Sequence, residues 1–233
     1  GLNPEESWNV GINALSKFRW GYRDASFSVD AYRVTFGNRV FVDLDTPGEA
    51  VIRQGYSQSE SVQAEFWWDW SKRLDITVAY RYVNALSDYG DFSGYREDPF
   101  VAKHRGFMTF AYGSRPNAVG HQWRADVTLQ ATGPQRLPKT ALEGNPQAYQ
   151  RPDYAPTFAT GNIQLSRDFG EGKQLYAGVE NVTNYRQADP IIASGEAGLG
   201  LSASENPSFD ASLVYAPIFG RNMYVGVRWA FER

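Results

Sequence analysis

The chain has 233 residues, of which 15% are aromatic, and 22 glycines and 12 prolines interrupt it often. This composition favours a strand-rich protein of one large or two small domains. The formal charge of −3 gives no general electrostatic reason to bind nucleic acid, and the lack of cysteine excludes disulfides and thiolate metal sites.

A membrane-spanning helix is excluded as well. The longest stretch without a charged residue, Tyr154–Ser166, is far shorter than the roughly 20 apolar residues that such a helix needs. A transmembrane strand needs only about 9–11 residues, and only every second one must be apolar. Strands that cross a membrane are therefore allowed.

Apolar and polar side chains alternate with a period of two, beginning between Trp8 and Trp20. In a strand this pattern sends apolar side chains to one face and polar side chains to the other. It predicts ten strands, with a weaker pattern in the fifth. They cover residues 8–20, 26–31, 61–70, 76–82, 107–112, 122–130, 159–165, 175–180, 209–215 and 223–232.

The links between these strands alternate in length. Short links are predicted near residues 20–24, 71–74, 113–119, 168–173 and 217–221, and long links near 41–59, 85–102, 132–155 and 184–207. Outer-membrane barrels have short periplasmic turns and long external loops. We therefore predict an all-β protein, a transmembrane antiparallel up-and-down β-barrel whose apolar rows face lipid and whose polar rows face the lumen. Aromatic residues at both ends of a row suit the two interfacial girdles.

Charged side chains fall on the predicted polar face. The acids are Asp30, Glu65, Asp69, Asp126, Glu180 and Asp210, and the bases are Lys17, Arg19, Arg81, Arg124 and Arg228. Charges of both signs are ordinary in a water-filled lumen or against a plug, although paired carboxylates also serve hydrolysis. We interpret these residues as lumen lining.

Four segments carry a resemblance to a known family. They are Leu2–Asn9 (LNPEESWN), Lys103–Arg105 (KHR), Val179–Tyr185 (VENVTNY) and Tyr215–Val227, which contains a P-x-x-G-R element read as a closing hairpin. Together and in this order they resemble the second half of TonB-dependent outer-membrane receptors. The resemblance implies that residues 1–233 are about ten C-terminal strands of a 22-stranded barrel, with the plug domain and the preceding strands outside this chain.

The same resemblance implies function, location and partners. Such receptors take up a scarce ligand across the outer membrane of a Gram-negative bacterium: a metal chelate such as a siderophore or haem, cobalamin, or an oligosaccharide. The expected partners are the N-terminal part of the receptor, TonB acting through that part, outer-membrane lipid and a surface lipoprotein. No catalytic residue and no cofactor is expected.

The long links are the expected place for ligand contacts, because specificity usually lies on loops held by a rigid scaffold. The candidates are Tyr89, Phe92, Tyr95 and Arg96, followed by Glu97 and Asp98, and in a later link Tyr149, Arg151 and Tyr154. The only histidines, His104 and His121, would need to converge with a carboxylate to bind a metal ion, and we expect no metal site.

Two other functions fit the alternation alone. One is a ten-stranded outer-membrane protease with an acidic site at its external rim. The other is a soluble carbohydrate-binding β-sandwich in which the apolar rows form the core. Periodicity does not separate a lipid-facing row from a core-facing row.

Overall fold

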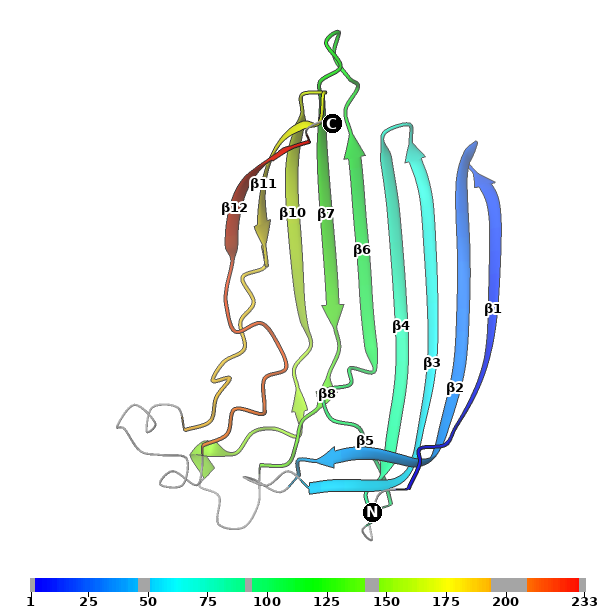
Figure 1. Ribbon diagram of the computed structural model, residues 1–233, viewed down its shortest axis with the longest axis vertical. Helices are drawn as coiled ribbons and strands as arrows, with labels where there is room; N and C mark the ends of the chain where they lie inside the picture. Colours follow the sequence, from blue (N-terminus) through cyan, green and yellow to red (C-terminus); the bar gives the residue numbers. More distant parts are fainter. Residues whose placement is uncertain (1–2, 46–50, 91–93, 141–146, 194–208, 231–233) are drawn as a thin grey trace.

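A computed structural model describes residues 3–45, 51–90, 94–140, 147–193 and 209–230. They form an antiparallel sheet of ten strands, nine of which lie side by side in the order β1-β2-β3-β4-β6-β7-β10-β11-β12 (Figure 1). The strands are β1 Ser7–Trp20, β2 Arg23–Asp43, β3 Val51–Ser71, β4 Leu74–Asp88, β5 Tyr95–Glu97, β6 His104–Gly113, β7 Gln122–Thr132, β8 Gln135–Arg136, β9 Tyr154–Ala155, β10 Phe158–Asp168, β11 Lys173–Glu180 and β12 Asn222–Trp229. A short 3-10 helix covers Gln147–Tyr149.

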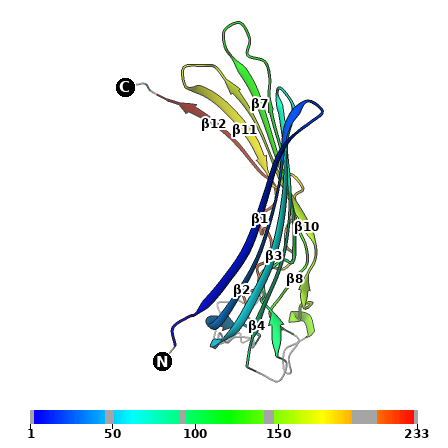
Figure 2. The same cartoon turned by 90° about the vertical axis from the view of Figure 1, so that its right-hand side faces the viewer.

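The sheet is a single curved layer (Figure 2). β5 pairs with the end of β4, and the two-residue strands β8 and β9 form a small separate sheet. A β-sandwich needs a second sheet packed against the first, and the described residues build no such layer. The described strands therefore do not form the two packed sheets of a sandwich. Within the described chain, no helix has both the length and the apolar character needed to cross a membrane.

Links of two kinds lie at opposite ends of the sheet, as predicted, although the link 44–50 is shorter than the predicted 41–59 and no longer than the link 114–121. Residues 21–22, 72–73, 114–121 and 169–172 connect strands at one end of the sheet, here called the turn end. Residues 44–50, 89–103, 133–157 and 181–221 connect them at the other, the long-loop end (Figure 1). In the first turn Gly21 and Tyr22 have φ of 60° and 65°. This left-handed pair is the type I′ geometry that joins two twisted antiparallel strands by two residues.

The strand register places the predicted apolar rows on one face. One row of paired residues crosses all nine strands and is apolar throughout: Phe18, Ala25, Trp68, Ile76, Phe110, Val127, Ile163, Val179 and Met223. Paired residues of antiparallel strands share a face. We call this the apolar face. The opposite, polar face carries rows such as Asn13, Asp30, Gln63, Arg81, Arg105 and Thr132.

Several aromatic residues depart from this division, among them Trp67 and Phe107. Trp67 pairs with Ser26 and Thr77, and Phe107 pairs with Ala79, so both lie on the polar face. The fifth predicted strand alternates weakly because Phe107 places an apolar ring on the otherwise polar face.

A cluster of rings closes the apolar face at the turn end. Trp68 stacks on Trp20 at 4.6 Å between centroids and meets Trp70 edge-on at 4.6 Å. Phe66 lies beside Trp20 at 5.5 Å. Along β1 the apolar row runs from Trp20 to Trp8, which at ~3.3 Å per residue and a tilt of about 40° gives roughly 30 Å, enough for the apolar band of a barrel wall, about 25 Å, with a tryptophan at each end.

The β2–β3 hairpin is longer than predicted. The sequence indicated a link over residues 41–59, but β2 continues to Asp43 and β3 begins at Val51. A register shift between Phe36 and Arg39 interrupts the pairing. Such a bulge bends a strand, and Figure 1 shows the ends of β2 and β3 lying across the long-loop end of the sheet.

The predicted ninth strand, Phe209–Tyr215, is wrong, and so is the closing hairpin at 217–221. β11 pairs directly with β12, and the tenth strand of the sheet is β5 instead. Segment 209–215 makes one isolated bridge, between Asp210 and Ile192. The Gln187 side chain binds Leu213 O and the Tyr215 N–H, each at 2.8 Å, and so takes up backbone groups that a strand partner would use.

Candidate functional site

At the long-loop end three segments meet over the polar face. They are the β2–β3 tip (residues 39–45 and 51–55), the described part of the β4–β6 link (89–90 and 94–103) and the start of the β7–β10 link (133–140). We call them the loop cluster. β2 and β3 position the tip because their pairing continues beyond the bulge, which turns the tip across the ends of the neighbouring strands.

A buried serine anchors this cluster to the wall. Ser87 near the end of β4 is 0% exposed, and its hydroxyl lies 2.9 Å from that of Ser57, its register partner on β3. Ser87 donates to Asp98 Oδ1 at 2.6 Å, and Arg39 donates to Asp98 Oδ2 at 2.5 Å and to Ser87 Oγ at 3.2 Å. These contacts tie the tip, the β4–β6 link and the wall together.

Two aspartates of the tip hold a cluster of arginines. Arg53 donates to Asp43 Oδ2 at 2.6 Å. Asp45 accepts hydrogen bonds from both Arg96 and Arg136, and its other oxygen accepts the Lys139 backbone N–H at 3.0 Å. Because the side chains of Asp45, Arg96 and Arg136 are nearly buried, their charges are compensated by ion pairs and not by water.

Tyr89 lies in the middle of this network. It is 2% exposed, its ring meets Phe41 edge-on at 4.9 Å, and the Arg96 guanidinium carbon lies 3.8 Å from its centroid. Burial raises the pKa of the Tyr89 phenol above its ordinary value, and the nearby Asp98 carboxylate adds to the rise. The phenol is therefore neutral at physiological pH and serves as an apolar surface for the arginine.

A second ion pair faces outward from the cluster. Lys103 donates to Glu97 Oε1 at 2.5 Å, and the Tyr154 hydroxyl donates to Glu97 Oε2 at 3.3 Å. The hydrogen bond to Glu97 raises the pKa of Lys103, and partial burial followed by the Glu97 charge raises the pKa of Tyr154. With Tyr154 49% exposed, this pair presents hydrogen-bonding groups at the surface.

The structure brings several of the predicted site residues together but gives them different surroundings. Tyr89 and Arg96 are buried in the loop cluster, whereas Tyr95, in β5, is 50% exposed. Phe92 lies outside the described residues. Tyr149 ends the 3-10 helix, and the Arg151 guanidinium donates to the carbonyls of Ala148 and Gln150, each at 3.3 Å. A ligand-contacting role for these residues stays a prediction.

A small cavity of about 100 Å³ joins two long links. Arg151 and Tyr154 line it from the β7–β10 link, and Gln187, Asp189 and Tyr215 line it from the β11–β12 link. Partial burial raises the pKa of Tyr215 to about 12, and the neighbouring Tyr185 adds to the rise. The cavity offers one cation, one carboxylate and several hydrogen-bonding groups to a small polar moiety.

Among the residues of these sites that the sequence analysis missed are Asp43, Asp45, Arg136 and Gln187. Asp43 and Asp45 could have been recognised as two closely spaced carboxylates in a predicted long link. No pattern marks Arg136 or Gln187, because their partners lie far away in the chain.

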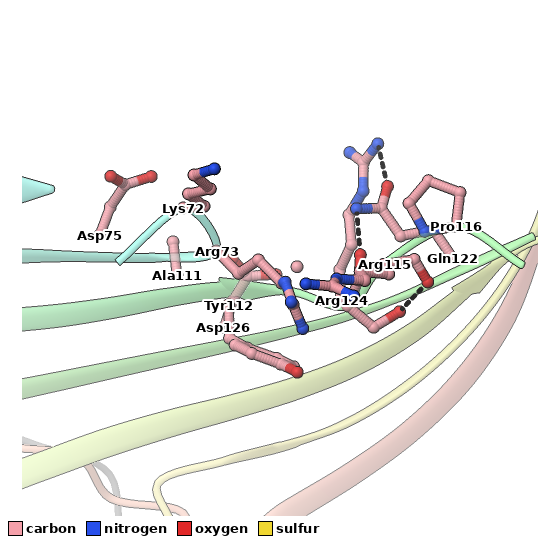
Figure 3. A pocket seen from close by; sticks show the side chains of 12 residues that line it. Lys72, Arg73, Asp75, Ala111, Tyr112, Arg115, Pro116, Gln122, Arg124 and Asp126 are labelled. Carbon is pink, nitrogen blue, oxygen red and sulfur yellow. Dashed lines mark hydrogen bonds between the residues drawn. The ribbon is translucent and has the colours of Figure 1, made fainter. Parts of the chain in front are cut away.

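A wider hollow of about 570 Å³ lies on the polar face at the turn end (Figure 3). Its cationic lining comprises Lys72, Arg73, Arg115 and Arg124, against the carboxylates of Asp75 and Asp126. Arg124 lies 3.7 Å from Asp168. In the described part of the chain the other three cations have no side-chain hydrogen bond or ion pair. The surplus positive charge attracts anionic groups.

The two histidines do not converge. His104 begins β6 at the long-loop end, with Nδ1 2.6 Å from the Tyr80 hydroxyl, whereas His121 precedes β7 at the turn end and meets the Phe169 ring at 5.3 Å. Glu97 and Asp98 are paired with Lys103 and Arg39. The described residues contain no group of three metal-ligating side chains.

Comparison with known proteins agrees with this architecture. Residues 1–182 match the family model described as TonB dependent receptor-like, beta-barrel. No curated protein sequence matches the chain significantly.

Two solved structures are similar to the chain over 99% of its length. The ferric-catecholate import receptor Fiu of E. coli K12, in its closed form, matches with a TM-score of 0.63 and 12% identity, and the chain covers 28% of it. The copper transporter OprC matches with a TM-score of 0.65 and 15% identity, and the chain covers 32% of it. At these identities the likeness shows the fold, and the chain spans about a third of either receptor.

Proposed function

Because the chain belongs to the TonB-dependent receptor-like β-barrel family, we propose that it supplies wall strands and long loops to an importer of the bacterial outer membrane. The observation that carries the proposal is the apolar row that crosses nine strands on one face, combined with long links at only one end of the sheet. In lipid such a face needs no covering layer, whereas in water it would remain exposed.

The two sheet edges support a larger assembly. β1 is exposed at all of its positions, and β12 forms the other edge of the described sheet. Unpaired backbone groups in hydrocarbon cost several kcal/mol each. We therefore infer that further strands of the same receptor pair with both edges to close the barrel, so that residues 1–233 form its C-terminal portion and a plug occupies the lumen.

The proposed activity is uptake of a scarce ligand without a catalytic step. The ligand binds at the long-loop end, and TonB, acting on the plug, supplies the energy for its release inward. Metal chelates such as a siderophore or haem, cobalamin and oligosaccharides are the candidate classes. The names of Fiu and OprC, importers of a ferric catecholate and of copper, favour a metal-containing ligand. A surface lipoprotein is a further candidate partner.

Uptake in cells that express the intact receptor tests this proposal. We expect accumulation of at least one of radiolabelled ferric catecholate, haem or cobalamin, and we expect it to stop in a strain without TonB. Replacement of the exposed loop residues in a Tyr95→Ala/Tyr154→Ala variant should reduce uptake roughly tenfold, because aromatic and hydroxyl contacts at the rim are lost. Tyr22→Ala, at the turn end and 91% exposed, is the control and should not change uptake. TonB-independent accumulation would contradict the proposal.

A further inference from the structure

A strip of alternating rings and cations lies on the apolar face at the turn end. It consists of Trp123, Arg167, Phe169, Lys173 and Trp229, and we call it the rim strip. Arg167 pairs with Trp123 and Leu175, and Lys173 pairs with Trp229, which places all of them on the apolar face. The Phe169 N–H donates to Lys173 O at 2.9 Å, which joins the ends of β10 and β11 at the turn end.

Both cations lie over aromatic rings. The Arg167 guanidinium carbon is 4.8 Å from the Trp123 centroid and 6.0 Å from that of Phe169. Lys173 Nζ is 5.5 Å from the Trp229 centroid. Stacking on a ring holds a cation in place without neutralising it.

The positive charge of the strip is only partly compensated. Within the described residues Arg167 has ring contacts but no hydrogen bond and no ion pair. Its neighbour Asp168 faces the other side of the sheet, where it lies 3.7 Å from Arg124. Lys173 donates to Glu171 Oε2 at 2.9 Å, but the Glu171 side chain is 84% exposed. Among the described residues, the Arg167 guanidinium of the strip therefore has no anionic partner.

The rim of the first strands differs. There the apolar face ends in the cluster of Trp20, Phe66, Trp68 and Trp70, and the nearby cation Arg23 lies 3.3 Å from the Asp69 carboxylate. An aromatic cluster of this kind suits the interface without an anionic partner. On the apolar face the unpaired cation is thus a local feature of the β7–β12 side, whereas the unpaired cations Lys72, Arg73 and Arg115 line the hollow on the polar face.

An arginine at this position needs an anion. Tryptophan rings sit at the level of the lipid headgroups, and long basic side chains extend their charge towards the same level. The planar guanidinium matches two phosphate oxygens at once, and a second cation nearby strengthens the contact. A phosphodiester at the end of an acyl chain would satisfy both cations while its tail covers the apolar rows beside them.

We propose that the rim strip binds the phosphate of a membrane phospholipid in the leaflet at the turn end, with Arg167 as the bidentate donor and Lys173 as the second cation. The inference rests on the proposed function, because it requires the apolar face to lie in a membrane.

Lipid binding to the intact receptor, purified from membranes in a mild detergent, tests the inference by native mass spectrometry. The probes are phosphatidylglycerol and a glycosyl diacylglycerol of the same chain length, which lacks phosphate. Wild-type receptor should prefer phosphatidylglycerol, and Arg167→Gln/Lys173→Gln should bind it roughly tenfold more weakly. The matched control is Lys17→Gln/Arg19→Gln, which removes two charges at the same end but on the polar face and should bind as the wild type does.

Three results would overturn the inference. They are equal affinity of the wild type for both lipids, unchanged affinity in the Arg167→Gln/Lys173→Gln variant, and displacement of the lipid by inorganic phosphate, which would indicate a site for the free ion. The first and third use only wild-type receptor, so a variant that fails to fold does not block the test. If the receptor is in the membrane fraction and takes up ligand but shows one of these results, only phospholipid binding by the rim strip is refuted. A receptor recovered outside the membrane would refute the proposed function too.

Discussion

At the scale of single residues, the loop cluster depends on one carboxylate. Asp45 joins Arg96 of the β4–β6 link to Arg136 of β8, and it also accepts the Lys139 backbone N–H. The side chain is 9% exposed, so water does little to stabilise the two guanidinium groups when the carboxylate is removed. The sequence pointed to Arg96 and Tyr89 as ligand contacts; the structure packs both inside the cluster, and their contact with a ligand stays a prediction.

We expect Asp45→Asn to loosen the β2–β3 tip. The amide keeps the size of the side chain but loses its charge, which should cost roughly 1–3 kcal/mol of local stability. Hydrogen–deuterium exchange should then rise in residues 39–45 and 51–55 and stay unchanged in the middle of β2 and β3. Glu60→Gln, which removes an exposed ion pair with Arg33, is the control and should leave exchange unchanged. Uniform acceleration across the hairpin would show that Asp45 stabilises the strands and not the tip.

At the scale of elements, the strands follow local rules that the sequence displays, and their ends do not. β1 and β7 have nearly the predicted extents, because alternation of side chains continues to their termini. β2 and β3 exceed them because the register shift after Phe36 moves the alternation out of phase while the pairing continues. Segment 209–215 alternates like a strand, yet the Gln187 side chain occupies its backbone groups.

Glycine–tyrosine pairs on the polar face stabilise the last hairpin. Tyr176 is the register partner of Gly226, and its ring lies over that glycine. A Cβ added at Gly226 would come within 2.4 Å of the ring. Tyr224 lies over Gly178 in the same way, and the two tyrosine rings meet edge-on at 6.2 Å. The glycines therefore allow large rings to lie flat against the lumen side of the wall.

Gly226→Ala should destabilise the intact receptor by roughly 1–3 kcal/mol, because the methyl group displaces the Tyr176 ring. Urea unfolding in lipid vesicles, followed by tryptophan fluorescence, measures the change. Addition of Tyr176→Ala should remove the clash, so that the double variant costs less than the sum of the single ones. Gly106→Ala is the control, because its Cβ would meet Ala131 at an ordinary 3.8 Å. Additive costs in the double variant would rule out ring displacement as the cause.

At the scale of the whole molecule, the sheet has two unlike ends and two unlike faces. Under the proposed function the apolar face would meet lipid, and the unlike ends would set the orientation, with long links outside and short turns in the periplasm. Because the chain contains no cysteine, a single introduced thiol can report this orientation.

We expect Tyr95→Cys, at the long-loop end, to react with a polymer-linked maleimide on intact cells. Tyr22→Cys, in the first turn, should react only after the outer membrane is opened, since the polymer is too large to cross it. Both side chains are at least half exposed, so the thiols differ in location and not in burial. The measurement is a gel shift of the receptor, compared with the same receptor without an introduced cysteine. The reverse pattern of labelling would invert the proposed orientation, and labelling of both on intact cells would refute a membrane-spanning wall.

The sequence by itself determined the strand-rich class, the division of side chains into two faces, the alternation of short and long links and the family. These properties are local: a period of two, turn residues and short motifs can be recognised without knowing what lies opposite them. Only the tertiary structure decided where the β2–β3 tip folds, which residues form the loop cluster and why segment 209–215 is not a strand. Those outcomes depend on partners far apart in the chain. Asp45 and Arg136, for example, are 91 positions apart, and no local pattern encodes such a pairing.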